Sequence, residues 1–259
     1  PRIGHMRIED VTRHHIIEIL DEIMARGSPT QANRVLSHTR KLFNWALDRG
    51  MVDYSPVFGI KPPAKDIARD RVLKDEELKR LWPVWSDIGW PFGPIFKLLL
   101  ITGQRRGEVS SMKWSDIDFE RRTWTIPREI AKNDRTHEVP LPDLAMEIIE
   151  TVPRLNSQDL LFTTNGRSVV SGFSKAKRIS DSKANVHDYR IHDLRRTAAS
   201  GMARLAVPPH VVEKILNHSS GTISGVAAVY NRYGYETEKR EALNKWADFF
   251  VGLLISNRD

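Results

Sequence analysis

Residues 102–109 read TGQRRGEV and follow directly on a segment, Pro91 to Ile101, that is apolar nearly all round. An apolar segment of this length predicts a buried helix. Gly103 permits a sharp turn out of that helix, so Arg105 would extend from a rigid support. Glu108, three residues further on, can pair with an arginine and orient its guanidinium. The segment therefore predicts a fixed cation at the end of a buried helix.

Elsewhere the chain reads as mainly helical with one small antiparallel sheet. Residues 114–119 and 123–126 alternate apolar and polar side chains across the connection 120–122, which is typical of a β-hairpin, and 137–139 offer a third strand. Other segments carry apolar residues at helical spacing, and Thr30 is a candidate N-cap for one of them. They predict helices within 10–26, 30–49, 75–82, 191–205, 209–216 and 237–254.

A proline-rich connection divides these predicted elements into two groups. Pro62 and Pro63 preclude a regular helix at that point. We therefore expect a helical domain over residues 1–60, a linker over 61–72 and a second domain over 73–259. Two helices in ~50 residues bury little apolar surface. That small core predicts that the first domain is truncated at its N-terminus.

Two groups of basic residues accompany these elements. The linker carries Arg69 and Arg71, and a run in the second domain carries Lys175, Lys177 and Arg178. Each group could contact the phosphates of a polyanion or could simply be solvated. With a nucleic acid as partner, phosphate contact is favoured for the second group. Its removal should then weaken binding to all sequences alike.

The overall composition favours a polyanionic partner and excludes several chemistries. The chain of 259 residues has 40 Lys and Arg against 33 Asp and Glu, a formal net charge of +7, and such a surplus suits a nucleic acid. It contains no Cys, so disulfides, thiolate metal sites and Cys nucleophiles are excluded. No apolar stretch reaches the roughly 18 residues of a membrane span. No signal peptide is visible either, and we expect a cytoplasmic protein.

Six polar side chains spread along the second domain could together act on a phosphate. They are two guanidiniums, two imidazoles, an ammonium and a phenol: Arg105, Arg195, His192, His218, Lys132 and Tyr230. Guanidiniums grip a phosphate in bidentate fashion, while imidazoles and ammonium groups donate protons or hydrogen bonds. A phenol can attack phosphorus and hold it covalently. No other set of residues in the sequence supplies so many parts of one reaction.

The predicted surroundings of these residues fit such a site. Lys132 lies in a polar turn between the second and third strands, where a side chain can reach a substrate. His192 and Arg195 are three residues apart at the start of a helix, so they share one face near an end that favours anions. Arg106 competes with Arg105 for a place in the site, but a side chain one position further on should point elsewhere.

The order of these residues resembles that of the tyrosine recombinases, the phage-integrase family. The shared pattern is Thr-Gly-x-Arg-x-x-Glu, a hairpin lysine, His-x-x-Arg, Leu-x-His and a C-terminal tyrosine. The residues around Tyr230, VYNRY, are similar in particular to those of integrases from temperate phages and genomic islands. The resemblance covers 73–259 as a catalytic domain and, more weakly, about 7–60 as a helical core-binding domain.

The resemblance implies a cut-and-rejoin reaction on DNA. Tyr230 would attack a phosphodiester, form a 3′-phosphotyrosyl link and release a 5′-hydroxyl that Lys132 protonates. Rejoining would need no ATP, and neither a metal nor another cofactor is expected, because cationic side chains take that role. Tyr233 and Tyr235 are alternative nucleophiles, but Tyr230 alone has the sequence context of the family.

The same resemblance implies roles for the other residues of the set. Arg105 and Arg195 would neutralise the phosphate oxygens in the transition state. His192 and His218 would add hydrogen bonds, and His192 could help to deprotonate the tyrosine. Glu108 would organise the site from behind the arginines. One departure is Asn217, where the family usually has Gly before the histidine; we expect this change to alter the local turn and not the chemistry.

The partners that the resemblance implies are DNA and further copies of the chain. We expect double-stranded DNA with attachment core sites, a tetramer assembled on that DNA from a protomer that could be monomeric in solution, and accessory DNA-bending proteins. A location at the bacterial nucleoid follows from such a substrate. The last helix would carry an apolar stripe that packs within the chain or docks on a neighbouring copy. The rival functions are a type IB topoisomerase-like DNA relaxer and a non-catalytic DNA-binding protein.

Overall fold

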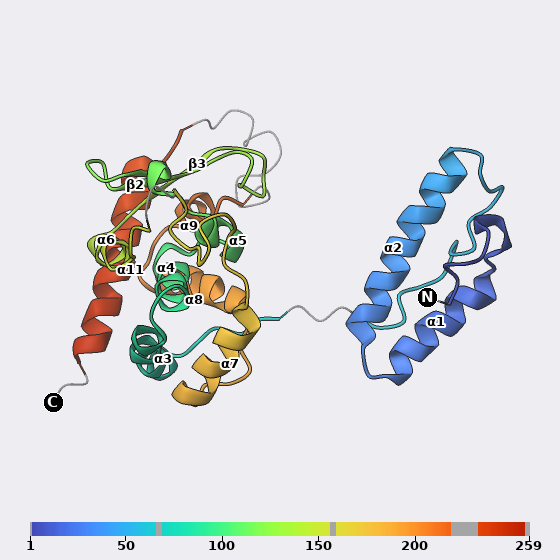
Figure 1. Cartoon of the computed structure of the whole chain (residues 1–259), viewed down its shortest axis with the longest axis horizontal. Helices are drawn as coiled ribbons and strands as arrows, with labels where there is room; N and C mark the ends of the chain where they lie inside the picture. The colour runs from blue at the N-terminus through green and yellow to red at the C-terminus, as the bar shows by residue number, and fades with distance from the viewer. Residues whose placement is uncertain (1, 66–68, 156–158, 219–232, 257–259) are drawn as a thin grey trace. The chain divides into compact units, whose positions relative to one another are not determined.

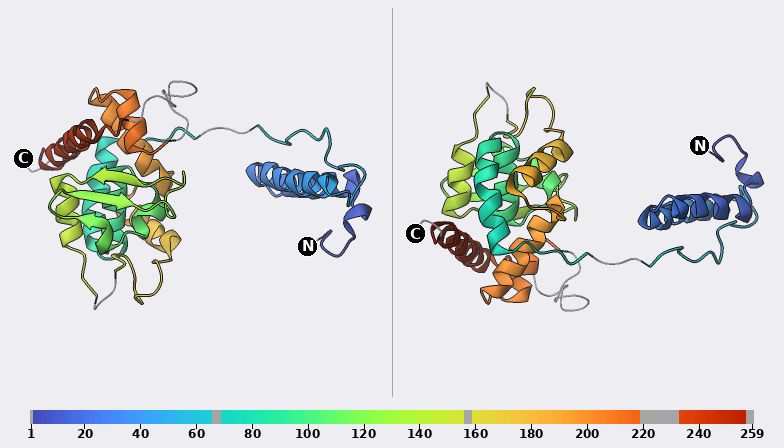
Figure 2. Two further views of the ribbon diagram at one scale, coloured as in Figure 1. Left: turned by 90° about the horizontal axis from the view of Figure 1, so that it is seen from above. Right: turned by 90° about the horizontal axis from the view of Figure 1, so that it is seen from below.

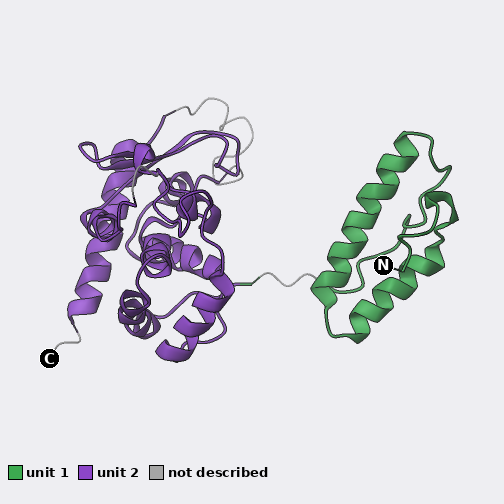
Figure 3. Ribbon diagram, viewed as in Figure 1, with its two compact units in different colours: residues 1–69 green, residues 70–259 purple. Residues whose placement is uncertain are grey.

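Helices predominate in this protein, and one small sheet accompanies them (Figure 1). The computed structural model describes residues 2–65, 69–155, 159–218 and 233–256. It confirms the predicted fold class, which is mainly helical with a small antiparallel sheet. The chain divides into two compact units, Pro1–Arg69 and Asp70–Asp259, here called unit 1 and unit 2 (Figure 3). The boundary between the units falls inside the segment 61–72.

Unit 1 is a helical pair closed by the chain that follows it. Its elements are η1 (Ile8–Asp10), α1 (Arg13–Ala25) and α2 (Pro29–Asp48). Ser28 is the N-cap of α2 and Pro29 lies in its first turn, where the missing N–H of a proline costs nothing. The predicted N-cap at Thr30 is therefore two residues too late. The core of the unit consists of Val11, Ile16, Leu20, Ile23, Ala32, Leu36, Phe43, Val57 and Ile60.

Unit 2 is built around one buried helix, α4 (Phe92–Thr102), which corresponds to the apolar segment of the sequence. Every residue of α4 is buried except Phe92 and Lys97, which are half-buried. The helices that pack on α4 are α3 (Asp75–Ile88), α5 (Arg106–Ser110), α6 (Asp143–Glu150), α8 (Ile191–Arg204) and α11 (Glu236–Ile255). Among the described residues, unit 2 also contains α7 (Phe173–Ala184), which packs on α3, and α9 (Pro209–Ile215), which packs on α8 and α11. The end of α4 is thus held from several sides.

The sheet of unit 2 lies on one side of its helices (Figure 2). It has the order β1-β2-β3 and is antiparallel, with β1 (Ile117–Asp118), β2 (Thr123–Ile126) and β3 (His137–Pro140). The predicted hairpin is present, but its first strand is shorter than the predicted 114–119. Residues Trp114–Asp116 form the 3-10 helix η2 instead. The connection between β2 and β3 carries Lys132.

The C-terminal helix α11 packs within its own unit. Trp246 and Phe250 are buried in the main core, and the indole Nε1–H of Trp246 donates to the backbone oxygen of Leu100, 3.0 Å away. Gly201 of α8 lies against that indole, since a Cβ built on it would come within 2.2 Å of the ring. The apolar stripe of the last helix is therefore covered from within the chain. None of the helices that the structure describes is long and apolar enough to cross a bilayer.

Candidate active site

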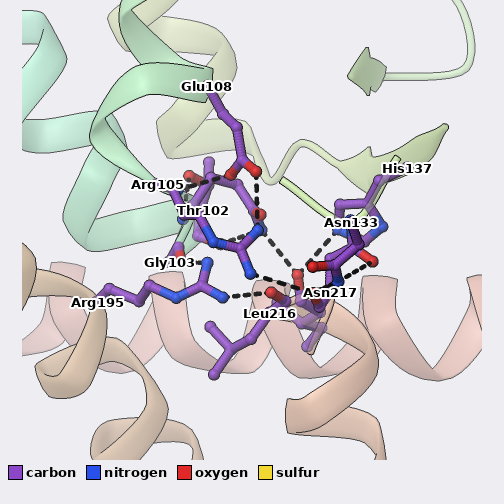
Figure 4. Close-up of polar contacts among 11 residues, drawn as sticks. Thr102, Gly103, Arg105, Glu108, Asn133, His137, Arg195, Leu216 and Asn217 are labelled. Atoms are coloured by element: carbon purple, nitrogen blue, oxygen red, sulfur yellow. Dashed lines mark hydrogen bonds and ion pairs between the residues drawn. The ribbon is translucent and has the colours of Figure 1, made fainter. Parts of the chain in front are cut away.

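Three consecutive backbone oxygens at the end of α9 form the centre of the candidate site (Figure 4). They belong to Ile215, Leu216 and Asn217, and are called here the α9 carbonyl cluster. The last carbonyls of a helix have no partner within the helix and carry its negative dipole end. Arg195 donates from Nη2 to the oxygen of Leu216, and Arg105 donates from Nη2 to that of Asn217 at 3.2 Å. Two cations far apart in the sequence are thereby fixed side by side.

Arg105 is held at the N-cap of α5 by a carboxylate three residues on. Glu108 accepts from the backbone N–H of Arg105 at 2.9 Å and from its Nη1 at 2.8 Å. The Glu108 side chain is 3% exposed and that of Arg105 19%. With the third bond to the α9 carbonyl cluster, the guanidinium is anchored on two edges and keeps part of its surface accessible. Glu108 thus pairs with an arginine, as the sequence predicts, and that arginine is Arg105.

Arg195 lies deeper, on the buried face of α8. Its Nη1 donates to the backbone oxygen of Gly103 at 2.7 Å, and its Nη2 donates to that of Leu216. Burial lowers the pKa of Arg195 to about 10, and the charge of Arg105 contributes. The guanidinium stays protonated near neutral pH. Gly103 has φ +65°, a conformation that glycine adopts without strain, and this turn aims its carbonyl at Arg195.

His192 lies one turn before Arg195 and is more exposed. Partial burial lowers the pKa of His192, and the charges of Arg195 and Arg196 lower it further. The imidazole is therefore neutral near pH 7 and can accept a proton. The start of α8 is fixed by Asp193, which accepts from the backbone N–H of Arg190 at 2.8 Å. His192 and Arg195 thus share one face, as their spacing predicts.

His218 directly follows the α9 carbonyl cluster and is exposed. Its Nδ1 lies 2.7 Å from Oε2 of Glu213, one turn back on α9. Since a carboxylate only accepts hydrogen bonds, Nδ1 carries the proton in this contact and Nε2 is left to face a substrate. Glu213 orients this ring much as Glu108 orients Arg105.

Lys132 is exposed on the loop 127–136 between β2 and β3. Two contacts shape that loop. Arg128 and Asp134 pair across it through two hydrogen bonds of 2.7 and 2.8 Å. Asn133, the next residue after Lys132, donates from Nδ2 to the backbone oxygen of Asn217. The lysine loop therefore touches the same carbonyl that receives Arg105.

The sixth residue of the predicted set, Tyr230, lies outside the described residues. Two other tyrosines close to the C-terminal helix are described. Tyr233 is 58% exposed and its ring makes an edge contact with Tyr235, the centroids lying 4.8 Å apart. Tyr235 in turn contacts the ring of His210 at 5.3 Å. Five of the six residues are thus located, and three of them, Arg105, Arg195 and His218, gather at the end of α9.

Comparison with known proteins identifies the family. A family model described as the phage integrase family matches residues 71–235, and a second, the phage integrase central domain, matches residues 1–62. The chain belongs to the phage integrase family. Its family membership thus covers both units, and it agrees with the resemblance that the sequence motifs carry.

Individual members of the family are similar over most of this chain. Prophage integrase IntA of Escherichia coli K12 is 25% identical over 257 residues, which is 96% of this chain and 61% of that protein. The integrase of Shigella phage Sf6 is 24% identical over 96% of this chain and 66% of its own length. The chain therefore spans less than two thirds of the length of these integrases.

Solved integrase structures share the fold. A lambda integrase (75-356) dimer bound to a COC′ core site has a TM-score of 0.65 at 18% identity, covering 85% of this chain and 83% of that one. A lambda integrase tetramer bound to a Holliday junction has a TM-score of 0.64 at 20% identity, covering 84% and 67%. At such low identity, the likeness concerns the fold alone.

Two further residues of this chain contact the α9 carbonyl cluster and were not predicted from the sequence. Gln104 is 1% exposed and donates from Nε2 to the oxygens of Thr102 and Ile215, both at 2.9 Å. His137 is 8% exposed, and its Nε2–H donates to the oxygen of Ile215 at 3.0 Å. Burial, followed by the charge of Lys239, lowers the pKa of His137 to about 4, so the ring is neutral. From the sequence, this position is predicted only to lie in the third strand, 137–139.

The residues predicted to contact DNA have different surroundings in this chain. Arg71 is engaged: its Nη2 lies 2.5 Å from Oε1 of Glu77, and its Nε donates to the backbone of Asp188. Lys177 lies 2.5 Å from Asp181 and 3.4 Å from the ring centre of Tyr189. In the part of the chain that the structure describes, Arg71 and Lys177 therefore already hold protein groups.

The other residues predicted to contact DNA are exposed or half-buried. Lys175 and Arg178 are exposed on α7, and Arg69 is half-buried at the end of unit 1. Beside α7, a hollow of about 540 Å³ opens next to the candidate site. Its polar lining includes Arg106, Lys177, Arg190 and His192. Three positive side chains and His192 thus line one hollow.

Proposed function

We propose that this protein is a site-specific DNA recombinase that cleaves and rejoins duplex DNA through a 3′-phosphotyrosine at Tyr230, and so integrates or excises a mobile element. The observation that carries the proposal is the pair of arginines fixed on adjacent carbonyls of the α9 cluster. Two guanidiniums held in this way form a ready site for a phosphodiester. His218 follows the same cluster, and family membership supplies the context.

The cleavage step forms one bond and breaks one. The phenolic oxygen of Tyr230 attacks phosphorus, and its proton passes to neutral His192. The bond between phosphorus and the 5′-oxygen breaks, and Lys132 gives its proton to that oxygen. The DNA strand is then held as a phosphodiester of tyrosine, with a free 5′-hydroxyl. Attack by a 5′-hydroxyl of a partner strand reverses each transfer and rejoins DNA without ATP.

Fixed positive groups lower the barrier of this step. Arg105 and Arg195 meet the non-bridging oxygens as their negative charge grows, and they need little rearrangement because the α9 carbonyl cluster and Glu108 already hold them. Glu213 holds Nδ1 of His218, so Nε2 faces the phosphate and can donate to it when the ring carries a proton on both nitrogens. Removing a preorganised donor of this kind typically costs about 10²–10³ in rate. On this proposal the side chains supply the charge neutralisation, and no cofactor takes part.

The proposed substrate is duplex DNA with an attachment core site. We assign residues 1–60 as the core-binding domain, 61–72 as a linker and 73–259 as the catalytic domain. The basic hollow beside His192, together with Lys175 and Arg178 on α7, would contact phosphates. Lambda integrase has been solved as a dimer on a core site and as a tetramer on a Holliday junction. By analogy we propose that four protomers act on two sites at the bacterial nucleoid, with help from DNA-bending proteins.

A suicide substrate tests the proposal. A duplex that carries a core site from the junction of the encoding element, with a nick just 3′ of the scissile phosphate, loses its short 5′-hydroxyl strand after cleavage and traps the enzyme. In EDTA, the wild type should give a covalent protein–DNA band on a denaturing gel, and Tyr230→Phe should give none. Tyr233→Phe and Tyr235→Phe are the matched controls and should keep the band.

Other outcomes assign the rival functions. A band that survives in Tyr230→Phe would move the nucleophile to another residue. Binding of the duplex without any band would favour a non-catalytic DNA-binding protein. Relaxation of supercoiled plasmids without strand exchange between two sites would favour a type IB topoisomerase-like activity.

A further inference from the structure

The side-chain amide of Asn133 ties the loop that carries Lys132 to the arginine site. The side chain of Asn133 donates from Nδ2 to the backbone oxygen of Asn217, and the same nitrogen lies 3.4 Å from Oδ1 of Asn217 (Figure 4). Asn133 is half-buried, whereas Lys132 beside it is exposed. Consecutive Cα atoms are only about 3.8 Å apart. Fixing Asn133 therefore restricts where the backbone of Lys132 can lie.

The acceptor of this hydrogen bond is already part of the arginine site. The oxygen of Asn217 also accepts from Nη2 of Arg105 at 3.2 Å. A carbonyl oxygen has two lone pairs, so it can serve both donors at once. Asn217 has φ +48°, a left-handed conformation that Asn tolerates better than most residues and that Gly also adopts. That turn directs the oxygen toward both Arg105 and the lysine loop.

We propose that Asn133 is a positioning residue that sets Lys132 relative to Arg105 through the shared oxygen of Asn217. The inference rests on the proposed function, in which Lys132 protonates the 5′-oxygen that leaves. A proton donor must lie within hydrogen-bond reach of that oxygen. Arg105 fixes the phosphate to which the 5′-oxygen is bound. The oxygen of Asn217 accepts hydrogen bonds from both Arg105 and Asn133. It thereby fixes the position of the proton donor, Lys132, relative to the phosphate that Arg105 binds.

A simpler role for Asn133 would be to hold the loop together, and a second contact of the same loop controls for that role. Asp134 pairs with Arg128 across the loop, and both side chains are exposed. Asp134 also has φ +54°. Asp134→Asn removes the ion pair and keeps a residue that tolerates this backbone conformation. It loosens the loop without touching the bond to Asn217, and should leave cleavage within about twofold of the wild type.

A change of leaving atom separates the effect on Lys132 from any effect on Arg105. A substrate with sulfur in place of the scissile 5′-oxygen releases a thiolate. The pKa of a thiol is about 8.5, far below that of an alcohol. The sulfur substrate therefore needs no proton from Lys132, but still needs Arg105 to neutralise the phosphate.

The experiment compares single-turnover cleavage of both substrates by the wild type, Asn133→Ala, Lys132→Ala and the double variant. A general acid contributes about 10²–10⁴ in rate. We expect Asn133→Ala to cleave the oxygen substrate about 10- to 100-fold more slowly than the wild type, and the sulfur substrate at the wild-type rate. The double variant should be no slower than Lys132→Ala. Asn133→Leu, which is similar in size and neutral but cannot donate, should repeat the result of Asn133→Ala.

Other cleavage results would contradict either this inference or the proposed function, and the two cases can be told apart. An equal loss on both substrates would overturn the inference, because Asn133 would then act on the arginine site or on folding. Wild-type cleavage of the oxygen substrate by both Asn133 variants would overturn it as well. Failure of the sulfur substrate to rescue Lys132→Ala would refute the proposed role of Lys132, and with it the inference. No cleavage of either substrate by the wild type would refute the proposed function itself.

Discussion

Acidification should destabilise unit 2 through one buried histidine. His137 donates its Nε2–H to the oxygen of Ile215 and is 8% exposed. The charged groups around it come from three helices: Lys239 from α11, Glu108 from α5 and Arg195 from α8. Burial, followed by the charge of Lys239, lowers its pKa to about 4. A second proton on this ring would add a third cation to a site that already holds two.

The sign and size of the effect follow from this shift in pKa. In the unfolded chain the pKa of a histidine is about 6.5, so between pH 6.5 and 4 the unfolded state binds a proton that the native state does not. Stability must therefore fall as the pH falls. With about 1.36 kcal/mol for each pKa unit, the free energy of unfolding drops by about 2 kcal/mol from pH 7 to pH 5, and by about 3 kcal/mol at pH 4.

Urea unfolding of His137→Gln measures this contribution. Glutamine places an amide near the position of Nε2 and does not titrate, so the bond to Ile215 can persist without the pH dependence. Tryptophan fluorescence reports mainly on unit 2, because Trp45 alone of the seven tryptophans lies in unit 1. The wild type should lose about 2 kcal/mol more than the variant between pH 7 and pH 5. Groups that both proteins share, such as His192, cancel in this difference.

An equal pH dependence in the two proteins would refute the reasoning. It would mean that His137 titrates in the native state much as it does in the unfolded chain, and hence that the ring is not held neutral at the α9 carbonyl cluster. A steeper dependence in His137→Gln would refute it equally. If His137→Gln were less stable than the wild type by the same amount at every pH, that constant loss would reflect only the lost packing of the imidazole. The test would still be the change in stability between pH 7 and pH 5, compared between the two proteins.

Two further predictions concern packing and orientation. Gly201→Ala places a methyl group 2.2 Å from the ring of Trp246, so overpacking should lower the free energy of unfolding in urea by about 1–3 kcal/mol. The higher helix propensity of alanine should offset about 1 kcal/mol of that loss. Gly252→Ala, which meets nothing within 4 Å, should instead be neutral or stabilising, and equal effects at the two sites would contradict the packing argument. Glu213→Gln should slow suicide-substrate cleavage about tenfold by loosening His218, with unchanged binding of the duplex, and an unchanged rate would exclude that orienting role.

The parts of the site that could be predicted from the sequence are those that depend on short spacing. Glu108 pairs with Arg105 three residues away, and His192 shares a helical face with Arg195, also three residues away. The buried helix before Arg105 was evident from its continuous apolar character. Such local relations need only the geometry of one helix or one turn, and the residue types reveal them.

The α9 carbonyl cluster could not be predicted, because its acceptors are backbone oxygens that every residue possesses. Arg105 reaches the oxygen of Asn217 across 112 positions in the sequence, and His137 reaches that of Ile215 across 78. Only the packed fold brings these groups together. The role of the basic runs was also ambiguous, because the sequence does not show which basic side chains already pair with acidic ones in the fold. Lys177 reads as a candidate phosphate contact, yet its partner Asp181 lies one turn away on the same helix and already pairs with it.

The chemistry of the donors at the α9 carbonyl cluster follows from the charge that the site must hold. Arg105 and Arg195 repel each other, and Glu108 and Glu213 offset their charge, so the excess positive charge suited to a phosphate comes with Lys132 on the adjoining loop. The remaining bonds to the cluster come from three neutral side chains: Gln104, His137 and Asn133. A lysine or a protonated histidine at any of these positions would satisfy the same oxygen but add repulsion where the two guanidiniums are already crowded. Neutral donors therefore hold the backbone in place without adding repulsion, and the positive charge of the site stays available to bind the phosphate of the substrate. For the same reason, protonation of His137 alone should be enough to weaken the site.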